Sequence, residues 1–101
     1  MAVLRIELQD GFDDDEVVAT LDGREVARLS SVRSSLVTSL ADVAEVRAPD
    51  AGPVTVGVGL PGRGLEASAR VDDPATQRWI AVRVVDGRLL VEPRSEQPGY
   101  L

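Results

Sequence analysis

Apolar and polar residues alternate with a period of two along four separate segments, and this pattern constrains the fold of the chain more than any other feature. The four segments are residues 3–9, 54–60, 65–71 and 78–85. Alternation of this kind is typical of strands that bury one face and leave the other in water, as the strands of antiparallel sheets do.

Two Asp-Gly pairs stand between β-prone segments and predict tight hairpins. The first lies between residues 16–21 and 25–29, and the second lies between residues 78–85 and 89–92. Asp-Gly suits a type I′ turn, because both central residues of that turn need positive φ. A third turn is predicted at residues 60–64, where proline followed by glycine fits type II.

Residues 30–48 carry two conflicting patterns. Val32, Leu36, Leu40 and Val43 follow helical spacing, and the preceding serines could cap a helix. Several residues of this segment are poor helix formers, and a proline at position 49 favours extended backbone before it. We predict two strands, near residues 34–40 and 43–48, and one short helix is the alternative.

Eight or nine short strands with frequent turns predict an all-β fold. The expected architecture is a two-layer antiparallel β-sandwich, immunoglobulin-like or prealbumin-like, with a closed barrel as the alternative. Residues 1–94 are expected to form one domain, followed by a C-terminal tail at residues 95–101. Hydrophobic residues make up 44% of the chain and aromatic residues only 3%, which predicts an aliphatic core.

The sequence contains no histidine, no cysteine and no lysine. The commonest general base, the thiolate nucleophile and the Schiff-base amine are therefore missing, and a Ser-His-Asp site cannot be built from this chain alone. We expect a protein that is not an enzyme and needs no cofactor. A hydrolase that uses two carboxylates is the alternative.

The net charge of −6 bears on the partners of the chain. Nucleic acid and anionic membranes repel a negative surface, so neither is expected as a partner. The first residues lack the long apolar segment of a signal peptide, and no segment approaches the length of a membrane span. A cytoplasmic protein is the expectation.

Two segments resemble the PEGA family of small bacterial β-sandwich modules. Residues 17–27 read VVATLDGREVA, and residues 52–58 read GPVTVGV. Both the hairpin with its Asp-Gly turn and the later glycine before an alternating valine strand are found in that family. The resemblance covers under half of the chain, and the Thr-Pro that usually follows the first hairpin is absent. It implies an accessory β-sandwich module and transfers no site residues.

An acidic segment follows the first predicted strand. Asp13, Asp14 and Asp15 are candidate calcium ligands, because a hard cation takes six to eight oxygen ligands from a loop of this kind. The spacing does not match an EF-hand. The alternative is a solvated loop whose like charges discourage aggregation between sheet edges.

A second group of residues is predicted to form an interaction surface. Trp79 falls on the polar face of its strand, so it points away from the sandwich, near Arg78 and Arg83. Arg63, between two glycines, could clamp a carboxylate with both ends of its guanidinium. The tail ends in Tyr100 and Leu101, which either dock on the sandwich or reach another chain.

These features support a non-catalytic protein-interaction or assembly module. The expected partner is another protein or a second copy of the chain, which would make a homo-oligomer. The alternative is a module that binds a small ligand, calcium or a carbohydrate through the acidic loop or Trp79.

Overall fold

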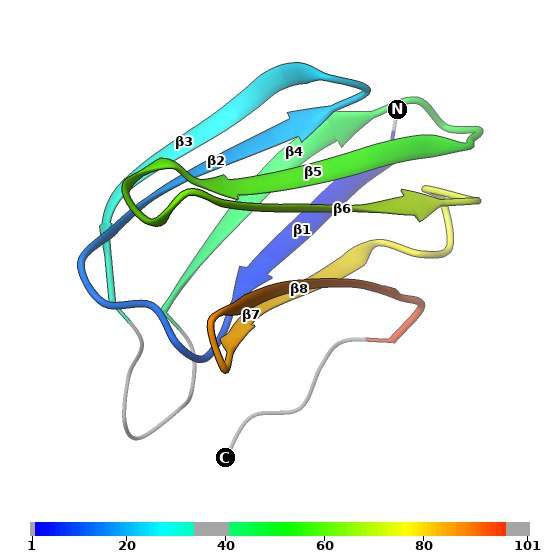
Figure 1. Ribbon diagram of the computed structural model, residues 1–101. Helices are drawn as coiled ribbons and strands as arrows, with labels where there is room; N and C mark the ends of the chain where they lie inside the picture. Colours follow the sequence, from blue (N-terminus) through cyan, green and yellow to red (C-terminus); the bar gives the residue numbers. More distant parts are fainter. Residues whose placement is uncertain (1, 34–40, 97–101) are drawn as a thin grey trace.

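Eight β-strands form two packed sheets in the computed structural model, which describes residues 2–33 and 41–96 (Figure 1). The strands are β1 (Ala2–Leu8), β2 (Asp15–Leu21), β3 (Arg24–Val32), β4 (Asp42–Ala48), β5 (Val54–Leu60), β6 (Leu65–Val71), β7 (Trp79–Val85) and β8 (Arg88–Arg94). A 3₁₀ turn, η1 (Pro61–Arg63), connects β5 to β6. The predicted all-β sandwich is confirmed.

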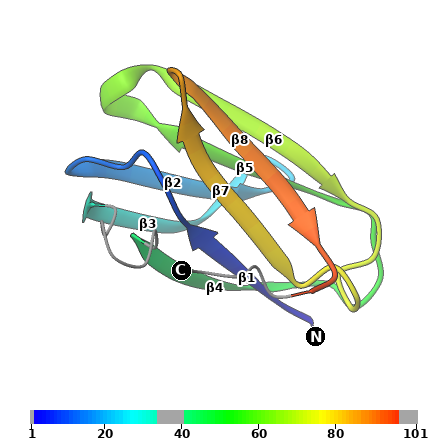
Figure 2. The same ribbon diagram turned by 90° about the horizontal axis from the view of Figure 1, so that it is seen from below.

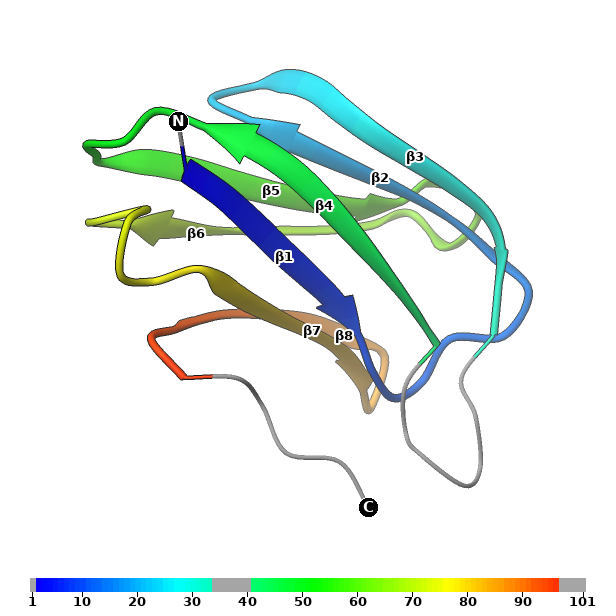
Figure 3. The same cartoon turned by 180° about the vertical axis from the view of Figure 1, so that it is seen from behind.

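Each sheet contains four strands. The first sheet has the order β4-β1-β7-β8, and the second sheet has the order β3-β2-β5-β6. Figure 3, which views the molecule from behind, shows β4 and β1 side by side. At one margin of the sandwich β6 and β8 approach each other (Figure 2), so the two layers converge there.

One strand pair departs from the antiparallel expectation, because β1 and β7 are parallel. Ile6 lies opposite Ile80 in this pair, and the pairing continues past the end of β1 through a hydrogen bond from Gln9 N to Val82 O of 2.8 Å. Parallel neighbours need a long crossover connection. Here the whole second sheet and β4 lie between the two strands in the sequence.

Both predicted Asp-Gly hairpins form. Asp22 and Gly23 have φ values of 50° and 84°, and Asp86 and Gly87 have φ values of 51° and 73°. Positive φ at both central residues is the property of a type I′ turn. The second turn sets the register of β7 with β8 along its whole length, whereas the pairing of β2 with β3 shifts at an irregularity between Ala19 and Thr20.

The type II turn predicted at residues 60–64 is wrong. Leu60 pairs with Leu65, so the loop between the strands has four residues rather than two. A loop of that length closes through a 3₁₀ turn, in which Gly64 N donates to Pro61 O at 3.3 Å. The residue with positive φ is therefore Gly64, at 65°, and not Gly62.

The segment that carried conflicting patterns is mostly strand where the structure describes it. β3 continues to Val32, and β4 (Asp42–Ala48) confirms the strand predicted near residues 43–48. The strand predicted near residues 34–40 lies outside the described residues. Irregular pairing between β2 and β3 accompanies a positive φ of 56° at Ser31.

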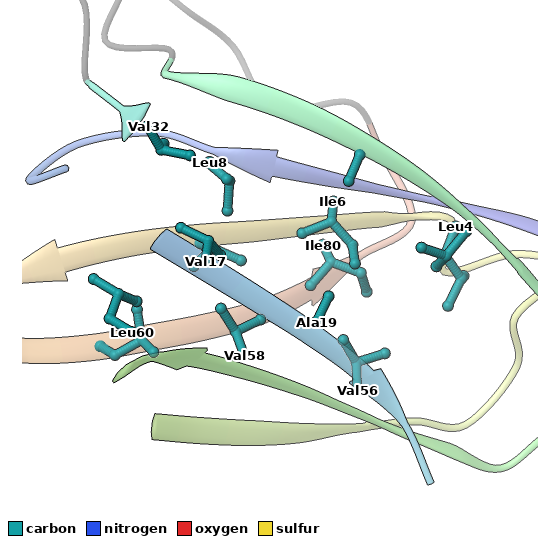
Figure 4. Close-up of a cluster of buried hydrophobic side chains, with 14 of the residues drawn as sticks. Leu4, Ile6, Leu8, Val17, Ala19, Val32, Val56, Val58, Leu60 and Ile80 are labelled. Carbon is teal, nitrogen blue, oxygen red and sulfur yellow. The ribbon is translucent and has the colours of Figure 1, made fainter. Parts of the chain in front are cut away.

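The core is aliphatic, as the composition predicted. Alternate residues of both sheets meet between the layers, including Leu4, Ile6, Leu8, Val17, Ala19, Val56, Val58, Leu60 and Ile80 (Figure 4). Phe12 adds one aromatic ring to this cluster. Burying each large aliphatic side chain contributes roughly 1.5–3 kcal/mol, which is the main source of stability for such a sandwich.

Candidate interaction surface

Trp79 lies in a row of four residues that crosses the outer face of the first sheet. Cross-strand pairing places Glu45, Arg5, Trp79 and Arg94 opposite one another on β4, β1, β7 and β8. This set is called the Trp79 row below. The buried residues Ile80, Val82 and Val84 alternate with Trp79 along β7, so the indole points away from the core, as predicted. Trp79 is itself partly buried.

The neighbouring row on the same face holds an unusual glutamate. Glu7 points away from the core between its buried neighbours Ile6 and Leu8, yet its side chain is only 1% exposed. Arg5 Nε lies 3.4 Å from Glu7 Oε1, and neither atom has a hydrogen-bond partner among the described residues. Burial raises the pKa of Glu7, and attraction to Arg5 opposes this shift only in part.

Ion pairs between arginine and glutamate lie on the strands β7 and β8 beside Trp79. Glu92 accepts hydrogen bonds from Arg83 and Arg94, each at 3.1 Å, through its two separate oxygens. Arg78 donates from Nε to Ala75 O at 2.9 Å, immediately before β7. The structure therefore brings Trp79 and Arg83 onto one face and places Arg78 at its margin.

Arg63 lies elsewhere, in the turn between β5 and β6 of the second sheet. Its Nε donates to Asp15 Oδ1 at 2.9 Å, and its Nη2 donates to Asp15 Oδ2 at 2.6 Å. The same Nη2 also donates to Gly11 O at 2.9 Å. Arg63 thus clamps a carboxylate with both ends of its guanidinium, but the carboxylate belongs to its own chain.

The acidic loop connects the two sheets, and its three candidate calcium ligands have different surroundings. Asp15 is 8% exposed and uses both oxygens on Arg63, while Asp13 N also donates to Asp15 Oδ2 at 2.8 Å. Asp13 and Asp14 are exposed. Across residues 2–33 and 41–96, no three acidic side chains form a group that could hold a metal ion.

Gly11 shows why this loop follows a fixed path. A side chain at this position would overlap the backbone of Val84, and Gly11 has a φ of 90°. Only glycine fits such a close approach at positive φ. Val84 N donates to Asp10 O at 2.9 Å, which holds the loop against β7.

Tyr100 and Leu101, the two tail residues of the predicted surface, lie outside the described residues. Their part in an interface stays a prediction.

The outer face of the second sheet holds a groove that the sequence reasoning missed. It has a volume of about 800 Å³, and its lining includes Val18, Gly57, Gly59, Glu66 and Ser68. The signal was present in the sequence, because glycines occupy alternate positions opposite the valines of residues 54–60. A strand whose outer positions lack side chains leaves a trench between its two neighbours.

Comparisons of the chain with protein-family models, with curated proteins and with solved structures give no match. The resemblance to the PEGA modules therefore stays a prediction. No helix among the described residues is long and apolar enough to cross a membrane. The fold is an all-β, two-layer sandwich.

Proposed function

We propose that this chain is a non-catalytic protein-interaction domain and that it binds a partner protein through the Trp79 row. The main support is the position of Trp79. Its side chain is partly buried on an outer sheet face, and Arg5 and Arg94 lie opposite it on the adjoining strands. Tryptophan and arginine are the residue types most enriched at the energetic centres of protein interfaces.

The charges around Trp79 suit recognition of a protein surface. Glu45 and Arg94 stand at the two ends of the row, and Glu92 bridges two arginines beside it. Ion pairs at an interface margin set orientation and association rate more than affinity, while the desolvated centre supplies affinity. A partner is therefore expected to cover the indole and to align its own charges with this pattern.

Two further observations support an accessory role over a catalytic one. Histidine, cysteine and lysine are absent from the sequence, which removes most groups that perform acid-base or nucleophilic chemistry near neutral pH. The resemblance of residues 17–27 and 52–58 to PEGA modules points in the same direction. We also propose that this domain is located in the cytoplasm.

Affinity capture with three forms of the chain tests the proposal. Wild type, Trp79→Ala and Trp79→Phe are immobilised at equal density, and each captured protein is then purified and titrated against all three. Loss of a centrally buried tryptophan typically weakens binding by 2 kcal/mol or more, which is about thirty-fold. We expect Trp79→Ala to bind at least that much more weakly, and Trp79→Phe to retain part of the affinity.

Thermal melts of each form show whether the variants are folded. Equal affinity of wild type and folded Trp79→Ala for every captured partner would contradict the proposal.

A further inference from the structure

Among the described residues, β4 is a regular sheet edge that lacks the usual protection of edge strands (Figure 3). Natural proteins protect their edges with bulges, prolines or covering segments, because unpaired backbone groups can pair with another chain. β3 pairs irregularly with β2, β8 contains Pro93, and β6 and β8 approach each other at the opposite margin. β4 pairs with β1 without a register shift and contains no proline.

The backbone groups of Glu45 and Arg47 point away from the first sheet. Arg5 N donates to the carbonyl oxygen of the residue before β7 at 2.7 Å, so Arg5 directs its backbone groups toward β7. This direction alternates along a strand, and the residues on either side of Arg5 therefore bond to β4, where they lie opposite Ala44 and Val46. Glu45 and Arg47 alternate with that pair, so their amides and carbonyls face the open edge.

The neighbouring positions limit the open edge to these two residues. Val43 N donates to Asp42 Oδ1 at 2.8 Å, and Pro49, which follows β4, has no N–H group. Within residues 2–33 and 41–96, neither Glu45 N nor Arg47 N donates to a backbone carbonyl outside the ladder with β1. A strand added at this edge must therefore pair with Glu45 and Arg47.

The side chains at this edge carry unbalanced charges of opposite sign. Arg5 Nη1 lies 3.3 Å from Glu45 Oε1, and Arg5 Nε lies 3.4 Å from Glu7 Oε1. One guanidinium is thus shared by two carboxylates, and with both ionised this group has a net negative charge. Arg47 is exposed and lies opposite Val3, so no carboxylate of β1 faces it. The edge therefore needs an arginine beside Glu45 and a carboxylate beside Arg47.

We infer that a second copy of this chain supplies both groups by pairing its β4 antiparallel with the first β4. A two-fold axis perpendicular to the first sheet passes between the two Val46 residues. Glu45 of each copy then lies opposite Arg47 of the other, and each such pair exchanges two N–H···O bonds. One operation satisfies the backbone and the charges together, as an isologous interface requires. The two first sheets become one continuous sheet.

Charge selects this register over its neighbours. An axis at Glu45 would place two carboxylates opposite each other, and an axis at Arg47 would do the same with two guanidinium groups. Like charges directly opposite destabilise a strand pair. An axis at Ala44 would leave Arg47 without a carboxylate. Val46 is the position that pairs each charge with its opposite. An interface of one strand edge is small, so we expect a dissociation constant on the order of 0.1 mM.

Sedimentation equilibrium from about 20 µM to about 2 mM, on either side of that constant, tests the dimer. Arg47→Glu and Glu45→Arg are measured separately and as an equimolar mixture. Each variant alone places like charges opposite each other, so we expect it to self-associate at least about ten-fold more weakly than wild type. In the mixture both charged pairs are restored between unlike chains, and we expect association close to that of wild type.

Two controls match the charge changes at exposed positions away from β4. Arg88→Glu, at the start of β8, matches Arg47→Glu, and Glu66→Arg, on β6, matches Glu45→Arg. Both controls should dimerise as wild type does, and thermal melts show whether each variant is folded. A wild type that stays monomeric at the highest concentration would overturn the inference. So would a dimer that Arg47→Glu does not weaken, or a mixture that does not associate better than its components.

Amide hydrogen exchange locates the interface on the strand. In dilute protein the amides of Glu45 and Arg47 should exchange freely, while those of Ala44 and Val46 are already protected by β1. At about 2 mM all four should be protected. Protection of Glu45 and Arg47 in dilute protein would show that the chain covers this edge itself, and it would overturn the inference.

The dimer goes beyond the proposed function and is tested separately from it. Trp79→Ala removes the indole without changing β4, so it should dimerise as wild type does. Arg88→Glu and Glu66→Arg leave both Trp79 and β4 unchanged. Loss of partner capture without loss of the dimer, or the reverse, therefore shows which of the two proposals has failed.

Discussion

Arg63 and Asp15 are 48 positions apart in the sequence and hold each other through two parallel hydrogen bonds, from Nε to Oδ1 at 2.9 Å and from Nη2 to Oδ2 at 2.6 Å. The pair ties the turn after β5 to the first residue of β2. Asp15 is almost fully buried and Arg63 is about one-third exposed. The bidentate geometry gives this pair more strength than an ordinary surface ion pair.

Removing the arginine is expected to cost more stability than removing the carboxylate. Arg63→Ala leaves the buried Asp15 carboxylate without its counter-charge and with only the hydrogen bond from Asp13 N, and it should lower the free energy of unfolding by about 2–4 kcal/mol. Asp15→Ala leaves Arg63 free to reach water, so we expect a loss of about 1–2 kcal/mol. Urea denaturation of both variants and of the double variant measures the coupling, expected at about 1–2 kcal/mol. Strictly additive losses would show that the two residues act separately.

Each member of this pair stood out in the sequence, but the pairing did not. The acidic segment suggested calcium ligands, and the arginine between two glycines suggested a carboxylate clamp. A contact between positions 15 and 63 depends on how the two sheets are stacked, and no local pattern encodes that. The sequence therefore indicated the right chemistry for Arg63 and could not indicate its partner.

The buried carboxyl of Glu7 makes stability depend on pH. Burial raises the pKa of Glu7 in the folded chain, so the native state holds this proton more tightly than the unfolded state does. Stability linked to Glu7 is therefore complete below the unfolded pKa and is lost as the pH rises through the folded pKa. We expect Glu7→Gln to melt at a higher temperature than wild type at pH 7, and this difference to narrow as the pH falls toward 4.

The control for this measurement is Glu45→Gln, since Glu45 also pairs with Arg5 but is 62% exposed. It should change stability by no more than about 1 kcal/mol at either pH. A Glu7→Gln chain that is less stable than wild type at pH 7, by an amount that shrinks as the pH falls, would contradict this account and show that the Glu7 carboxylate stabilises the fold as a charge.

The turn between β5 and β6 can be tested with two alanines. Gly64 has a φ of 65°, so Gly64→Ala should cost about 1–2 kcal/mol, the usual penalty for a left-handed residue with a side chain. Gly62 does not have positive φ, and a side chain there meets nothing within 4 Å. Gly62→Ala should therefore be neutral or slightly stabilising. Thermal melts measure both variants. A type II turn would need positive φ at Gly62, so it would reverse the two results.

The sequence predicted most features that depend on neighbouring residues, except the type II turn at residues 60–64, and missed those that depend on contacts between distant strands. The Asp-Gly turns and the alternating strands were correct, because turn geometry and the two-residue period are local properties. The parallel pairing of β1 with β7 connects distant segments and left no local mark. Glu7 follows the alternation that assigns it to the solvent-facing side of β1, yet its side chain is only 1% exposed, and no local pattern indicates that burial.

Trp79 supplies a direct optical test of its position, because it is the only tryptophan of the chain. An outward-facing, partly buried indole should emit at longer wavelength than a core tryptophan and be quenched by acrylamide in the monomer. Trp79→Phe should abolish this emission. Blue-shifted emission that resists quenching in dilute protein would place the indole in the core and remove the basis for the Trp79 interface.

Site-specific photo-crosslinking shows whether a protein partner covers the Trp79 row. A photo-reactive phenylalanine analogue replaces Trp79 in one variant and the exposed loop residue Ala51 in another. Both chains are expressed in the cell of origin and irradiated. We predict a discrete crosslinked protein from position 79 that is absent from position 51. No crosslinked species from position 79, or the same species from both positions, would contradict the claim.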